Sequence, residues 1–173
     1  VDFRNVIRAI SEIDAPLVLH IIGDGEERDF FKNMASEFGV ERRIIFHGSL
    51  TEENMIAAIA NRCLAAIYPG AVGLSLIHYM MYGLPVLIPF RKDHMPEFAA
   101  FDKEKSGYIY DDDHKSLRDT IMYVIQEGRV LNDYIARENV AITEQSYNTS
   151  DMANRFIRLS ESLTFSNHEV SGF

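Results

Sequence analysis

Short apolar runs alternate with amphipathic stretches along the chain. Five runs rich in branched and aromatic residues predict buried strands, at residues 17–22, 44–46, 63–68, 85–88 and 107–110. Apolar positions at helical spacing between these runs predict helices at residues 26–38, 49–61 and 74–82, and a brief helix after Met95-Pro96-Glu97. Three more helices are predicted beyond residue 113, at 115–126, 131–143 and 150–163.

This order of strands and helices is typical of one α/β domain, a Rossmann-like three-layer fold with a parallel sheet covered on both faces and a helical C-terminus. Connections in such sheets are right-handed, and ligands bind beyond the carboxyl ends of the strands. The loops at residues 23–25, 47–49, 69–73 and 89–96 therefore become candidates for a binding site. We expect the domain to cover residues 1–165 and residues 166–173 to fray.

Net charge and cysteine content exclude several classes of partner and site. The net charge of −9 argues against nucleic acid as a partner and against anionic lipid surfaces, since both need a basic face. Cys63 is the single cysteine, so the chain forms no internal disulfide and no cysteine-rich metal site. No paired metal-ligand spacing is present, and we expect no metal. The chain begins at Val1 without a signal-peptide pattern, and we expect it to be part of a longer protein.

Gly23-Asp24-Gly25 stands where a dinucleotide fingerprint would lie, but Arg28 occupies the position of its third glycine. NAD binding, and with it a dehydrogenase, is therefore poorly supported. A tight turn between strand and helix is the simpler interpretation.

The stretch Gly70-Ala71-Val72-Gly73-Leu74-Ser75 joins a predicted strand to a predicted helix. Free amides at the start of a helix attract anions such as phosphate, and glycines let a ligand approach the backbone. The alternative is a purely structural turn. His78 lies one helical turn further, on the face of Leu74 and Met81, and is either a ligand-binding residue or a core histidine.

Two weaker candidates are His47, at the end of a predicted strand, and Arg91, in the basic loop after Pro89. Arg91 could neutralise a diphosphate or simply face solvent. His20, in mid-strand, is expected in the core. The carboxylates of Asp111-Asp112-Asp113 fit a helix N-cap better than a metal site.

The segment from Tyr68 to Val86 resembles the donor-binding signature of the group 1 retaining glycosyltransferases, which have the GT-B fold. The strand before Gly23-Asp24-Gly25, the strand before His47-Gly48, and Met95-Pro96-Glu97 with the glycine ten residues later resemble other parts of that family in order and spacing. The resemblance runs from Val1 to about residue 145. It implies the C-terminal, donor-binding half of a two-domain enzyme.

The chain departs from the family pattern in two ways. Gly70 and His78 stand where the family commonly has two glutamates, one near the donor sugar and one on the nucleotide ribose. The family's first strand of this domain, with an arginine and a lysine for the diphosphate, would lie upstream of Val1. The N-terminal acceptor domain would lie there too.

The resemblance implies transfer of a sugar from a UDP- or GDP-sugar to a glycan or lipid-linked acceptor, with retention and without a cofactor. The implied setting is bacterial capsule, O-antigen or exopolysaccharide synthesis in the cytoplasm, with peripheral membrane contact through the missing half. The implied donor-binding residues are Gly70, Ala71, Val72, Gly73, Leu74, Ser75 and His78, with Gly23, Gly25, His47, Gly48 and Arg91 as secondary candidates.

No catalytic residue is assigned within this chain. Two alternatives stay open, a nucleotide-sugar epimerase of the same fold and a non-catalytic nucleotide-binding module. Apolar residues of the last helix, such as Phe156 and Leu159, suggest that the isolated chain dimerises.

Overall fold

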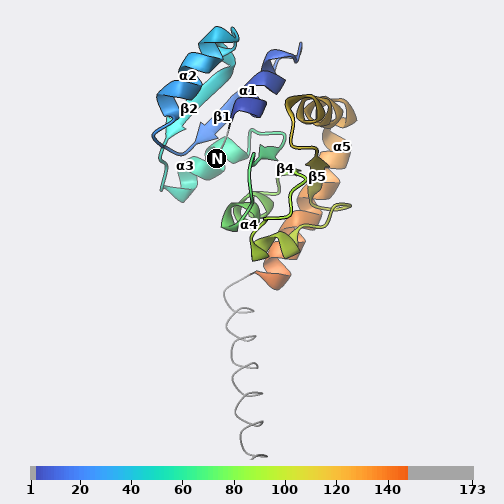
Figure 1. Ribbon diagram of the computed structural model, residues 1–173. Coiled ribbons are helices and arrows are strands. Elements are labelled where there is room, and N and C mark those ends of the chain that lie inside the picture. The colour runs from blue at the N-terminus through green and yellow to red at the C-terminus, as the bar shows by residue number, and fades with distance from the viewer. Residues whose placement is uncertain (1–2, 148–173) are drawn as a thin grey trace, which may run out of the picture.

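The computed structural model describes residues 3–147, apart from the side chains of residues 128–131. The strands are β1 (Leu19–Ile22), β2 (Ile44–Gly48), β3 (Ala66–Ile67), β4 (Val86–Pro89) and β5 (Gly107–Tyr110). The α-helices are α1 (Arg4–Ser11), α2 (Arg28–Glu37), α3 (Glu53–Ala60), α4 (Leu74–Met81) and α5 (His114–Ser146), and two short 3-10 helices are η1 (Glu41–Arg43) and η2 (Pro96–Ala100) (Figure 1).

All strand pairs among the described residues are parallel, as the sequence predicts. The strands form two sheets, β1-β2 and β3-β4-β5, and not one continuous sheet. In the first sheet Leu19 lies opposite Ile44, and in the second Val86 lies opposite Ala66 on one side and Gly107 on the other. Within residues 3–147, backbone hydrogen bonds therefore join strands of the same sheet only.

Three predicted elements, one strand and two helices, differ from the structure. The strand expected over residues 63–68 is reduced to Ala66 and Ile67, because the Cys63 amide closes a turn on the Ala60 carbonyl and Leu64 stays exposed. The helices expected at 115–126 and 131–143 are one helix, α5. The predicted helix at 150–163, with Phe156 and Leu159, and the tail at 166–173 lie outside the described residues.

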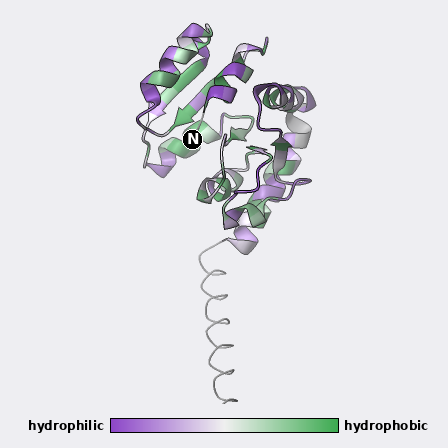
Figure 2. Cartoon of the chain, viewed as in Figure 1, coloured by the Kyte–Doolittle hydropathy of each residue, from purple (hydrophilic) through white to green (hydrophobic). Residues whose placement is uncertain are grey.

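Residues of both sheets share one hydrophobic core. Val6, Ile7 and Ile10 of α1 pack with Ile21 of β1, Leu87 of β4, and Leu117, Ile121 and Val124 of α5. In Figure 2 the strands of the first sheet are coloured as apolar, whereas the helices mix apolar and polar residues. Within the described residues, no helix combines the length and apolar character that crossing a bilayer requires.

A second cluster lies around α4. Leu76, Ile77 and Met80 pack against Val72, Val86, Ile88 and Ala100, with Ile142 of α5 at its margin. The buried amide of Asn139 on α5 donates to the carbonyls of Leu84 and Ser106, which precede β4 and β5. Helix α5 therefore touches both clusters and anchors the amino ends of these two strands.

Gly107 brings β5 unusually close to β4. Its φ is +151°, and a Cβ atom there would lie 2.1 Å from the Val86 carbonyl oxygen and 2.4 Å from the Val86 nitrogen. These are backbone atoms of a central strand, so they cannot move aside without breaking the ladder.

We predict that Gly107→Ala lowers the free energy of unfolding by about 3 kcal/mol or more, because the new methyl group collides with β4. Gly39→Ala is the matched control, because Gly39 also has a positive φ (+68°) but has no atom within 4 Å of the added Cβ. We expect the control to lose only about 1–2 kcal/mol. Urea denaturation measures both, and equal losses would contradict the steric argument.

Candidate functional site

The predicted loops follow the carboxyl ends of the strands, and two of them meet. Gly23, after β1, donates its amide to the carbonyl oxygen of Gly48, at the end of β2, over 2.8 Å. Both glycines have positive φ, +135° and +72°. Gly25, beyond them, donates its amide to the Asp24 carboxylate over 3.0 Å. The glycines therefore form a compact turn at the edge of the first sheet.

His47 pairs with His20 at the same sheet. His20 Nδ1 and His47 Nε2 lie 2.9 Å apart, and the rings stack with centroids 5.2 Å apart. His20 is half-buried, and burial lowers its pKa from 6.5, with the positive charges of His47 and Arg62 as smaller causes. The sequence predicts a core position for His20 but does not reveal this pairing, which depends on the register of β1 with β2.

The glycine-rich loop leads directly into α4. The Gly70 amide donates to the Tyr68 carbonyl, Val72 is fully buried, and Gly73 precedes the first residue of α4. No described side chain caps this helix, so the amides of Leu74 and Ser75 are free of a side-chain acceptor. The positive end of the helix dipole coincides with these amides, which makes the loop suited to an anion.

His94 holds this loop in place. The Val72 amide donates to His94 Nδ1 over 3.1 Å, and His94 Nε2 lies 3.1 Å from the Pro89 carbonyl oxygen. A carbonyl can only accept, so Nε2 carries the proton and Nδ1 is the acceptor. The Met95 amide donates to the Val72 carbonyl over 2.9 Å, and the His94 ring stacks on Phe98. The loop after β4 thus binds both polar groups of the Val72 backbone.

His78 is exposed, so it is not a core histidine. Leu74 and Met81, predicted to share its face, are exposed as well. Glu97 also approaches the start of α4, with its carboxylate 3.9 Å from where a Cβ of Gly73 would stand. The face of α4 that carries His78 is therefore open to a ligand.

Arg91 does not present a free guanidinium to the loop. It makes ion pairs of 2.9 Å with Asp93 and with Asp112, which lies just before α5. The hydrogen bond and charge of Asp93 raise the pKa of Arg91, and Arg91 in turn lowers the pKa of Asp93 to about 2. Asp113 caps α5 through the amides of Lys115 and Ser116, as the acidic run predicts.

No group of three or more histidine, cysteine, aspartate or glutamate side chains within residues 3–147 is arranged to hold a metal ion.

Comparison with protein families gives a direct match. Residues 2–141 fit the family model described as "Glycosyl transferases group 1". The chain belongs to the group 1 glycosyltransferase family. None of the curated proteins matches this chain.

Solved structures support the fold of this chain. A sucrose-phosphate synthase from Thermosynechococcus elongatus matches with a TM-score of 0.77 and 18% identity over 94% of this chain and 42% of its own. Anabaena HepE in complex with UDP matches with a TM-score of 0.77 and 17% identity over 91% of this chain and 44% of its own. The lipopolysaccharide outer core galactosyltransferase WaaB matches with a TM-score of 0.73 and 17% identity over 94% of this chain and 47% of its own.

These neighbours are GT-B glycosyltransferases, so the fold expected from the resemblance is confirmed. The chain spans less than half the length of each of them.

We predict that His94→Ala frees the glycine-rich loop. Without Nδ1 the buried Val72 amide loses its acceptor, and its hydrogen exchange should accelerate about tenfold, with a loss of about 1–2 kcal/mol in the free energy of unfolding. Amide exchange followed by NMR measures this. His78→Ala is the control, because His78 is exposed on α4, and unchanged exchange at Val72 in His94→Ala would contradict the assignment.

The His20–His47 pair predicts a dependence of stability on pH. Because the pKa of His20 is lowered in the folded chain, its contribution is complete above the unfolded value of 6.5 and is lost as pH falls from there through the folded pKa. Thermal melts at about pH 7.5 and about pH 5.5 should therefore differ more for the native sequence than for His20→Gln. The exposed His78→Gln variant should keep the full difference, and a His20→Gln variant that also keeps it would refute the assignment.

Proposed function

We propose that the complete protein transfers a sugar from a UDP- or GDP-sugar to a glycan or lipid-linked acceptor with retention, and that this domain binds the donor. The setting we propose is cytoplasmic synthesis of a bacterial surface polysaccharide. The family match and the GT-B neighbours support sugar transfer. The UDP in the structure of HepE supports a nucleotide diphosphate donor.

The observation that carries this proposal is that no described side chain caps the start of α4, while His94 holds the glycine-rich loop that precedes it. In our scheme the amides of Gly73, Leu74 and Ser75 receive the diphosphate. Negative charge grows on this group as the sugar leaves, and fixed amide dipoles stabilise it without reorganisation. The two hydrogen bonds that the loop after β4 makes with the Val72 backbone support this role, because they fix the loop that precedes these amides.

Exposed His78, one turn along α4, binds a ribose hydroxyl or a phosphate oxygen in this scheme. The backbone at His47-Gly48 borders the base, and Gly23 supports it through its bond to Gly48. The domain offers no general base in this scheme, and the leaving phosphate accepts the proton of the acceptor hydroxyl. Arg91 joins the diphosphate only if it leaves Asp93 and Asp112.

A second candidate is a non-catalytic nucleotide-binding module. It is favoured by Gly70, which has no carboxylate to stand beside the donor sugar. Assays of the complete protein with and without acceptor separate the two functions. A product that forms only with acceptor supports the transferase, a changed donor without acceptor supports an epimerase, and binding without any product supports the module.

Binding is tested by ligand-observed NMR with UDP, GDP, ADP, CMP and NAD. We expect contact with UDP or GDP, weakened about tenfold in His78→Ala, which corresponds to about 1.4 kcal/mol. Ser75→Asp is a more specific test of binding than His78→Ala. A carboxylate in the first turn stabilises the helix by about 0.3–1 kcal/mol, yet it repels a diphosphate. We therefore expect it to lose binding while its melting temperature stays level or rises.

Ser75→Asn keeps a neutral polar side chain at the same position and is the control for shape, with binding close to that of the native sequence. Contact with NAD alone would overturn the proposal. Equal binding by Ser75→Asp and Ser75→Asn would show that no anion sits at the start of α4.

A further inference from the structure

The proposed function assigns backbone amides to the diphosphate of the donor but no side chain to its sugar. A sugar ring has hydroxyl groups around its rim and C–H groups on its faces, so it is bound by polar acceptors beside apolar surface. The glycine-rich loop, residues 70–75, contains no acidic side chain that could accept hydrogen bonds from these hydroxyls. A charged acceptor for the sugar therefore has to come from a neighbouring element.

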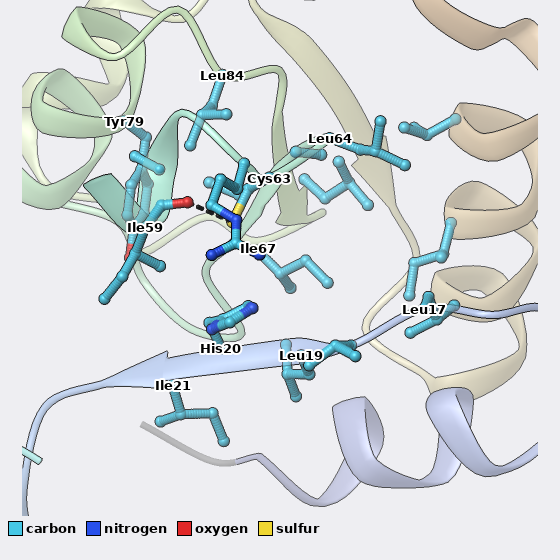
Figure 3. A pocket seen from close by; sticks show the side chains of 18 of the residues that line it. Leu17, Leu19, His20, Ile21, Ile59, Cys63, Leu64, Ile67, Tyr79 and Leu84 are labelled. Atoms are coloured by element: carbon cyan, nitrogen blue, oxygen red, sulfur yellow. Dashed lines mark hydrogen bonds between the residues drawn. The ribbon is translucent and has the colours of Figure 1, made fainter. Parts of the chain in front are cut away.

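The cavity of about 370 Å³ between the two sheets does not supply it (Figure 3). The walls of this cavity are mostly apolar, and Figure 3 shows Leu17, Leu19 and Ile67 among the side chains that line them. No residue of the glycine-rich loop lines the cavity either. A sugar attached to a diphosphate at the start of α4 therefore lies outside this cavity.

Glu97 brings a carboxylate to the start of α4. Its Oε2 atom lies 3.9 Å from where a Cβ of Gly73 would stand, and Gly73 immediately precedes the first residue of α4. Glu97 is half-buried, and among the residues that the structure describes its carboxylate has no hydrogen bond or ion pair. Such a carboxylate is available to a ligand, and a partner would offset the cost of its partial burial.

The 3-10 helix η2 holds Glu97 in this position. The Phe98 amide donates to the Met95 carbonyl over 2.9 Å, and the Phe98 ring stacks on His94 with centroids 4.4 Å apart. Phe98 and the buried Ala100 also pack in the hydrophobic cluster around α4. Glu97 therefore lies in an element that is fixed against both the glycine-rich loop and α4, which preorganises its position for a ligand.

The charge of Glu97 determines which part of a donor it can contact. An ionised carboxylate only accepts hydrogen bonds, so it repels a diphosphate and attracts hydroxyl groups, whose bonds to it are charge-assisted. Met95 adds apolar surface beside it, since the Met95 Cγ atom lies 3.5 Å from the same Cβ position of Gly73 and 55% of Met95 is exposed. The two side chains together match the hydroxyl rim and the C–H face of a sugar ring.

Building on the donor binding proposed above, we propose that the Glu97 carboxylate accepts hydrogen bonds from ring hydroxyls of the donor sugar, beside the diphosphate at the start of α4. Glu97 is then a specificity-determining residue. It selects nucleotide sugars whose sugar is neutral and has free hydroxyl groups, and it disfavours uronic acids, because two carboxylates at this position repel each other.

The test compares each nucleotide with its nucleotide sugar on the 173-residue chain, UDP with UDP-glucose and GDP with GDP-mannose, by titration followed by ligand-observed NMR. In one of these pairs the native chain should bind the nucleotide sugar more tightly than the nucleotide. Glu97→Gln should weaken the nucleotide sugar about tenfold. The same variant should bind the nucleotide alone as well as before or slightly better, and should bind UDP-glucuronic acid better, because a negative charge is removed.

Two further variants separate a direct contact from a general effect of charge. Glu97→Asp keeps the charge but shortens the side chain, so it should also lose affinity for the nucleotide sugar. Glu104→Gln removes the same charge at an exposed position before β5, at the end of the sheet opposite to the start of α4, and should bind every ligand as the native chain does. All three variants should melt within about 2 °C of the native chain.

Three outcomes would overturn the proposal. An equal loss of nucleotide and nucleotide sugar in Glu97→Gln would mean that Glu97 only positions the loop. If the native chain binds the nucleotide and Glu97→Gln leaves the nucleotide sugar unaffected, donor binding stands and the role of Glu97 fails. If the native chain contacts neither nucleotides nor nucleotide sugars, the proposed function fails and the role of Glu97 fails with it.

Discussion

The packing of α1 against α5 is the interaction on which the rest of the structure depends. No backbone hydrogen bond within the described residues joins the two sheets, so side chains alone hold them together. Val6, Ile7 and Ile10 meet Leu117, Ile121 and Val124 above strands of both sheets. Burial of such residues contributes roughly 1.5–3 kcal/mol each, relative to their exposure. Polar contacts add to this packing, because Arg118 pairs with Glu12 over 2.8 Å and the Asn5 amide donates to the Asp112 carbonyl over 3.3 Å. The relative placement of the two candidate loop groups therefore rests on side-chain contacts and not on a hydrogen-bonded ladder between the sheets.

Around the second sheet, hydrogen bonds fix the backbone in addition to apolar packing. Val72 is fixed through both of its backbone polar groups, and Asn139 fixes the opposite ends of β4 and β5. The start of α4 is thus held through backbone hydrogen bonds of the preceding loop, and the loops of β1 and β2 are held to each other by the bond from Gly23 to Gly48.

Much of the fold could be predicted because buried strands are continuous apolar runs. Residues 107–110 and the start of α4 at Leu74 agree with the structure to the residue. The break expected between the helices at 115–126 and 131–143 was wrong, since one glycine at position 128 costs a long helix only about 1 kcal/mol. The role of His94 could not be predicted, because its partners are five and 22 positions away and depend on two loops meeting. The pairing of Arg91 with Asp112 could not be predicted either, because these residues also lie on two loops far apart in the sequence.

Helix α5 is one continuous helix of 33 residues. Its first half belongs to the core under α1, whereas Asn139 and Ile142 reach the cluster around α4. Small domains can open in separate parts when their clusters share few contacts. Here α5 contacts both hydrophobic clusters and couples their unfolding, because local unfolding of either cluster exposes part of the same helix. The two halves of the domain should therefore melt as one cooperative unit, even though their sheets share no hydrogen bond.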